Sequence, residues 1–249
     1  MIKPTCLLDR HTLNDFPHLP CPRCESTIIP VDKKLDYQQS AESGFYQTHV
    51  ESGPEYYGGV FSLHLKCSKK SCSENLVCVG SFVLTEDTES PDPTPDFIPS
   101  IKPYFFTPTI HIFPLHKDIP EKVSKALIES FSLYWSNPSA AGNALRVAIE
   151  ALMDYRCVKK WIIDKNGKEQ ALSLHARIVE FKNNNSELAE KLLAIKWIGN
   201  GGSHLSGLDP NDMVIGYRLM EYVLDELFNN AKEELDRITK KINKTKKPA

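Results

Sequence analysis

The 249-residue sequence contains no uninterrupted apolar run that approaches the eighteen or so residues needed to cross a membrane. Its opening residues, MIKPTCLLDRH, also lack the long apolar core of a secretory signal peptide. We therefore expect a cytoplasmic protein with no membrane partner. The formal net charge is only −2, so no overall positive field indicates nucleic-acid binding.

The remaining composition is typical of a soluble globular protein, with 41% hydrophobic and 25% charged residues, and the length suits two modest domains. Residues 1–85 lack helical periodicity and contain two β-like runs, GGVFSLHLKC and NLVCVGSFVL, which predict a small sheet. Prolines spaced through residues 86–119 exclude helix interiors and central strands. They predict a connector that packs through its apolar side chains.

A period near 3.6 begins at residue 120 and predicts a helical region over residues 120–249. Val123, Leu127 and Phe131 mark the apolar stripe of its first helix, and Pro138 suits the first turn of the second. The last helix is predicted to start near Pro210 and to be long. We therefore expect an α+β protein, with a small β-rich module followed by a helical bundle.

The sequence has seven cysteines, and an odd number in a reducing compartment argues against a disulfide framework. Four of them form two close pairs, Cys21 with Cys24 in CPRC and Cys67 with Cys72 in CSKKSC. Zinc favours four soft ligands in a tetrahedron, and two such loops deliver them, as in a zinc ribbon. We expect a structural zinc ion, because four thiolates leave no coordination position for water. Unmetallated thiols are the alternative.

The segment LLAIKWIGNGGSHLSGLDP joins two helical patterns and contains a second candidate site. Gly199 is predicted to end the first helix in the left-handed conformation, which Asn200 also tolerates. His204 follows before the next helix, where it could act as a general acid or base or donate to a phosphate. The alternative is a turn in which the histidine caps a carbonyl or fills a packing gap.

Three ordered motifs, NPSAAGNALRVAIEALMD, LHARIVEF and IKWIGNGGSH, resemble the bacterial domain-of-unknown-function family 4145, which belongs to the HEPN group. The resemblance covers about residues 114–230, and members of this family often carry a cysteine-pair module in front. It implies an up-and-down helical bundle, often a homodimer, in proteins linked to restriction and anti-phage defence. The expected partners are a nucleic acid, RNA or DNA, or a defence effector protein.

HEPN ribonucleases cleave RNA without a metal through an Arg-Asn...His motif. Asn200 and His204 match its asparagine and histidine, whereas Gly199 stands at the position of the arginine. An arginine there would stabilise the charge that develops on the phosphate in the transition state, which glycine cannot do.

Two other cations are candidates to replace the missing arginine. Lys196 lies one turn earlier on the same helix, and Arg146 lies on the second helix. The alternative for Lys196 is a solvated surface lysine, and for Arg146 it is an ion pair with Glu150.

Three functions therefore remain open. The leading hypothesis is a non-catalytic or weakly catalytic module that binds nucleic acid or a defence effector, because the catalytic arginine is missing. The rival is a metal-independent ribonuclease that uses His204. The third is a zinc-ribbon nucleic-acid-binding protein whose helices dimerise, with Lys69 and Lys70 at the tip of a cysteine loop positioned to meet phosphates.

Overall fold

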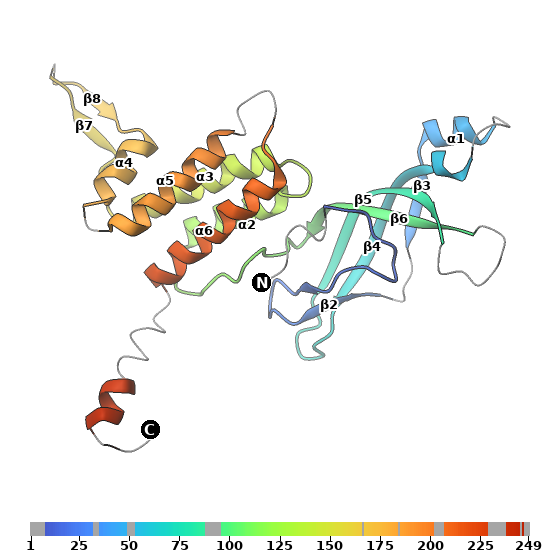
Figure 1. Cartoon of the computed structure of the whole chain (residues 1–249), viewed down its shortest axis with the longest axis horizontal. Helices are drawn as coiled ribbons and strands as arrows, with labels where there is room; N and C mark the ends of the chain where they lie inside the picture. Colours follow the sequence, from blue (N-terminus) through green and yellow to red (C-terminus); the bar gives the residue numbers. More distant parts are fainter. Residues whose placement is uncertain are drawn as a thin grey trace.

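The computed structural model describes residues 8–31, 35–48, 53–87, 96–165, 167–183, 185–201, 207–228, 238–244 and 246. A curled antiparallel sheet in the N-terminal part is followed by helices in the C-terminal part (Figure 1). The predicted α+β class is confirmed.

Six strands form the main sheet, in the order β1-β2-β4-β5-β6, with β3 paired to the same edge of β4 as β2. The strands are β1 (Leu19–Pro20), β2 (Thr27–Pro30), β3 (Asp36–Gln39), β4 (Gly58–Cys67), β5 (Asn75–Glu86) and β6 (Phe97–Thr107), and helix α1 (Ala41–Gln47) and the 3-10 helix η2 (Pro54–Tyr56) lie between β3 and β4. Alternate side chains of β4 and β5, such as Leu63 and Cys78, are fully buried. One face of the sheet therefore carries the core, as period-2 patterning requires.

Strand β6 corrects the prediction that residues 86–119 are only a connector. It runs antiparallel to β5 and includes Pro99 and Pro103. It is the last strand of the order, and on its other side only an isolated bridge joins His11 to Ile101. Prolines are tolerated in such an edge strand because few of its N–H groups need a partner.

The chain after β6 joins the sheet to the helices. Apolar side chains pack this stretch, as predicted: Phe106, Ile110, Ile112 and Phe113 are buried, whereas Phe105, on the outward face of β6, is exposed. The ring of Phe106 lies 5.2 Å from that of Trp135, and the ring of Phe113 lies 5.1 Å from that of Phe131. The sheet and the helices therefore share one apolar core.

The helical part consists of α2 (Glu121–Leu133), α3 (Pro138–Tyr155), α4 (Leu174–Phe181), α5 (Ser186–Gly201) and α6 (Pro210–Phe228), with a hairpin of β7 (Trp161–Ile163) and β8 (Glu169–Ala171) between α3 and α4. Residues 238–244 are also helical. Asn137 caps α3 by accepting a hydrogen bond from the Ala140 N–H, and Pro138 opens the helix as predicted. Helix α3 packs against α2, α5 and α6.

None of the helices in the described ranges has both the length and the apolar character that a membrane span requires.

Helices α3 and α5 approach closely at Gly142 and Gly199. A Cβ built on Gly199 would lie 2.7 Å from Cγ of Arg146 and 2.9 Å from the carbonyl oxygen of Gly142. The prediction that Gly199 ends its helix in the left-handed conformation is therefore wrong: α5 continues to Gly201, and Gly199 is not among the glycines with positive φ. The residue is a glycine because a neighbouring helix occupies the space of a side chain.

Gly199→Ala should therefore lower the free energy of unfolding by about 1 to 3 kcal/mol, as overpacking does in well-packed cores. The matched control is Gly201→Ala, because a Cβ there would meet only Cδ1 of Leu208, at 3.4 Å. Alanine favours a helix over glycine by up to about 1 kcal/mol, so the control should be neutral or stabilising. Urea unfolding measures both variants, and equal effects would contradict the close crossing.

Candidate functional site

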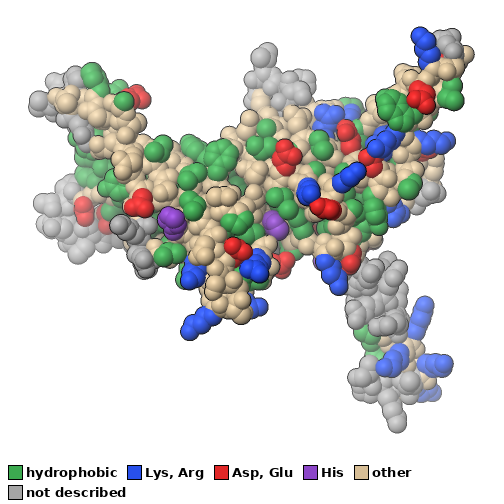
Figure 2. Space-filling model, turned by 180° about the vertical axis from the view of Figure 1, so that it is seen from behind, with side chains coloured by type: hydrophobic (Ala, Val, Ile, Leu, Met, Phe, Trp, Pro, Cys, Tyr) green, Lys and Arg blue, Asp and Glu red, His purple; other side chains and the backbone are tan. Residues whose placement is uncertain are grey.

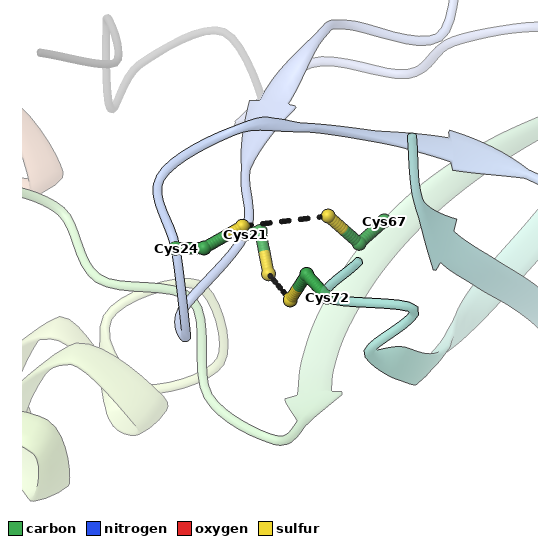
Figure 3. Close-up of side chains that lie close together, drawn as sticks. All are labelled: Cys21, Cys24, Cys67 and Cys72. Carbon is green, nitrogen blue, oxygen red and sulfur yellow. Dashed lines mark hydrogen bonds between the residues drawn. The ribbon is translucent and has the colours of Figure 1, made fainter. Parts of the chain in front are cut away.

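The four paired cysteines come together at one end of the sheet. Cys21 and Cys24 lie in the loop between β1 and β2, Cys67 is the last residue of β4, and Cys72 lies in the turn before β5 (Figure 3). Their sulfur atoms all lie within 4.8 Å of one another. Among the described residues, this is the one group of three or more His, Cys, Asp or Glu side chains arranged to hold a metal ion.

Two tight turns of similar construction present these thiols. In the first, the Cys21 N–H donates to the carbonyl of Ser26, and Glu25 adopts a φ of 62°. In the second, the Cys67 N–H donates to the carbonyl of Glu74, and Ser73 adopts a φ of 50°. Left-handed residues other than glycine are uncommon and mark tightly determined turns.

The four cysteines are free thiols rather than disulfides. The sulfur of Cys21 lies 3.8 Å from that of Cys72, and the sulfur of Cys24 lies 3.5 Å from that of Cys67, both far beyond the S–S bond length of about 2.05 Å. A tetrahedral zinc with Zn–S bonds of about 2.3 Å would set its ligands about 3.8 Å apart. The separations are therefore compatible with a zinc site.

The thiols of the cluster differ in how readily they ionise. Hydrogen bonds from the side chain and backbone of Ser26 lower the pKa of Cys24 to about 6, so this sulfur is a thiolate at neutral pH. Burial raises the pKa of Cys67 to about 12. A metal ion among the sulfurs would favour the thiolate form of all four, because it offsets both their burial and their mutual repulsion.

The remaining cysteines stand apart from the cluster. Cys78 is fully buried in β5, and burial raises the pKa of its thiol, as expected for an apolar core residue. Cys157 is exposed just beyond the end of α3. Cys6 lies outside the described residues.

A cavity of about 280 Å³ adjoins the cluster, and the sequence patterns did not indicate it. It is lined by Cys21 itself and by His18, Glu25 and His111, among others. Burial lowers the pKa of His111, and the charge of Glu25 partly opposes this effect. Its walls come from the first cysteine loop and from the stretch after β6, so only the folded chain brings them together.

The second candidate site is placed only in part, because His204 lies outside the described residues. Lys196 and Asn200 are four residues apart on α5 and so lie one turn apart on the same face. Gly199 lies between these two residues in the sequence, and the aliphatic part of Arg146, on α3, packs against it. Three of the four predicted residues therefore gather at the α3–α5 crossing.

Arg146 does not form the predicted ion pair. Among the described residues, no salt bridge joins it to Glu150, and its buried Nε has no hydrogen-bond partner. The side chain is half-buried and extends across the glycine of α5 instead.

Lys196 is not a solvated surface lysine either. Only 9% of it is exposed, and its Nζ lies 3.5 Å from the ring centroid of Trp197. This cation–π contact directs the ammonium to the indole. Trp197 itself is 58% exposed, and its ring centroid lies 6.0 Å from that of His175.

A partly buried charge cluster that joins α3, α4 and the residue before β7 was not predicted. Nη2 of Arg177 lies 2.6 Å from Oδ1 of Asp154, and Nζ of Lys160 lies 2.5 Å from its Oδ2. Burial alone would raise the pKa of Asp154, but these two hydrogen bonds outweigh it and lower the pKa. Arg177 is almost fully buried, so this cluster fixes α4 and the β7–β8 hairpin to α3.

Comparison with known proteins gives two matches, both to domains of unknown function. Residues 9–109, which include the sheet and the thiol cluster, match the family model of DUF8608. No curated protein and no solved structure matches the chain. Residues 129–245, which include α3, α5 and the Gly199 crossing, match the family model of DUF4145, the domain of unknown function that the three motifs of this part resemble.

Proposed function

We propose that the chain is a zinc-stabilised module that binds nucleic acid and does not cleave it, with a HEPN-like helical region. One observation carries the non-catalytic part of this proposal: at the position of the catalytic arginine, α3 leaves no space for a side chain on Gly199. The resemblance to the HEPN group associates such a module with restriction or anti-phage defence. A defence effector protein is the alternative partner.

Zinc is the metal that the thiol cluster fits best. Four cysteine ligands, separations near those of a tetrahedron and two tight turns are the features of a closed structural site. Such a site has no open position for a reactive water, so its role is to hold the β1–β2 loop against the end of β4.

Basic side chains near the cluster support nucleic-acid binding. Lys66, Lys69 and Lys70 are all exposed on or beside the second cysteine turn. Arg23 is exposed at the tip of the first turn, where it lies 3.8 Å from Glu74. Elsewhere the charges are mixed, and Figure 2 shows Lys and Arg side chains interspersed with Asp and Glu over the helical part. Cations grouped at one rigid tip suit contacts with phosphates.

The two cationic side chains at the α3–α5 crossing, Lys196 and Arg146, support a non-catalytic role. The ammonium of Lys196 faces Trp197, and the Arg146 side chain fills the space beside Gly199. Neither group is held by a partner that would aim it at a phosphate, as a preorganised site requires.

We also propose a homodimer through the helical region. Several large apolar side chains are more than half exposed there: Val147, Tyr155, Trp161, Ile163, Trp197 and Ile215. Exposed apolar side chains in such number favour a contact with another protein.

Zinc should be present at one ion per chain and should be required for the sheet to fold. Structural zinc contributes about 10 kcal/mol or more to the folding of small zinc modules, so Cys24→Ser should lower both the bound zinc and the unfolding temperature. Cys157→Ser is the matched control, because that thiol is exposed and outside the cluster. Metal analysis and thermal unfolding provide the measurement, and full stability after complete chelation would contradict a structural role.

Nucleic-acid binding should depend on the second cysteine turn. Lys69→Ala/Lys70→Ala should weaken binding and should reduce the slope of log affinity against log salt by about 1.5 to 2, the value for two lost phosphate contacts. Lys122→Ala/Lys125→Ala is the control, because it removes two exposed lysines from α2. Fluorescence anisotropy with labelled RNA and DNA measures the effect. Binding that ignores salt, or that both variants weaken equally, would refute this surface.

The purified protein should not cleave RNA in the absence of added metal. The rival ribonuclease is favoured by one observation, the unpaired Nε of Arg146 beside Gly199, which could act with Asn200 and His204. That rival predicts cyclic phosphate ends and a loss of cleavage in folded His204→Ala and Arg146→Ala variants. A broad RNA panel, checked by circular dichroism of each variant, decides between the two.

A further inference from the structure

The β7–β8 hairpin projects from the helices on the side away from the main sheet (Figure 1). All six of its strand residues are exposed. Those of β7 are apolar: Trp161 is 57% exposed, Ile162 42% and Ile163 74%. Those of β8 are Glu169, Gln170 and Ala171. The outer edge of β7 is therefore an apolar strand edge that no other strand of the described residues covers.

The hydrogen bonds of the hairpin show which groups face that edge. The Leu172 N–H donates to the carbonyl of Lys160, and the Asp164 N–H donates to the carbonyl of Lys168. Hydrogen-bonded and non-hydrogen-bonded pairs alternate along an antiparallel ladder. The N–H and C=O groups of residues 161 and 163 therefore point away from β8, toward the open edge.

An antiparallel partner must set outward-facing residues opposite one another, which leaves few registers for two copies of β7. A register centred on Trp161 would place Lys160 opposite Ile162, and one centred on Ile163 would place Ile162 opposite Asp164. A register centred on Ile162 instead pairs Trp161 with Ile163, and Ile162 with itself. It also places Lys160 opposite Asp164, so the charges are complementary at both ends.

We propose that β7 pairs with β7 of a second copy of this chain, antiparallel and centred on Ile162, to form a four-stranded sheet across a dimer. Residue 161 of each copy then faces residue 163 of the other, and each of these two pairs exchanges two N–H···O=C hydrogen bonds, which gives four backbone hydrogen bonds between the strands. This inference deepens the homodimer proposed above, since it names the strand that makes the contact.

The flanking charges set the limits of this pairing. Lys160 already contacts Asp154 in its own chain, so its ammonium would be shared between two carboxylates. The next pair places Lys159 opposite Lys165, which is unfavourable. The Lys159 ammonium also lies 3.9 Å from Glu180 in its own chain. The apolar centre and the inner ion pairs therefore favour association, and the outermost lysines confine it to this short segment.

Sedimentation equilibrium of the full chain over a concentration series tests the proposal. The wild type should form dimers, and Ile162→Lys should raise the dissociation constant about tenfold or more, because it sets two lysines directly opposite each other. Gln170→Lys is the matched control: it changes the cross-strand neighbour of Ile162 on the other edge of the same hairpin, and it should leave the dimer unchanged.

Cross-linking tests the register itself. In a Cys157→Ser background, Ile162→Cys should form an interchain disulfide on mild oxidation, because residues of a non-hydrogen-bonded pair have Cα atoms about 4.5 Å apart. Gln170→Cys should not. A dimer that Ile162→Lys leaves intact, or equal cross-linking at both positions, would overturn the β7 pairing and leave the homodimer standing. A monomer at all concentrations would overturn both.

Discussion

The close approach of α3 to α5 is the constraint on which the helical part depends. Two glycines face each other there, and the backbone of one helix occupies the space in which a side chain of the other would lie. This contact keeps α5 helical to Gly201, directs Arg146 across its surface and excludes a long side chain at position 199. A packing requirement therefore determines the chemistry available at this position.

The thiol cluster has the corresponding role in the sheet. It joins the short β1–β2 loop to the end of β4, beside the β2–β4 pairing of Ile28 with Cys67. The same loop lines the cavity that contains His18 and His111, so the cluster also fixes one wall of that cavity. The apolar stretch after β6 then carries the core from the sheet into the helices.

Local patterns predicted what depends on neighbours in sequence. The cysteine pairs, the helical period and the Pro138 start are all short-range signals, and the structure bears out each as a local feature. The failures concern contacts between distant segments. Nothing near Gly199 in the sequence indicates that α3 lies against it, and nothing near Arg177 indicates Asp154. Strand β6 was missed because its prolines are acceptable only at a sheet edge, a property of the whole sheet.

The most direct test of a non-catalytic helical region is Gly199→Arg, which restores the residue of the ribonuclease motif. The packing at the crossing predicts a variant less stable than Gly199→Ala that cleaves no RNA when assayed well below its unfolding temperature. A Gly199→Arg protein that keeps the unfolding temperature of the wild type and gains metal-independent RNA cleavage would contradict the account.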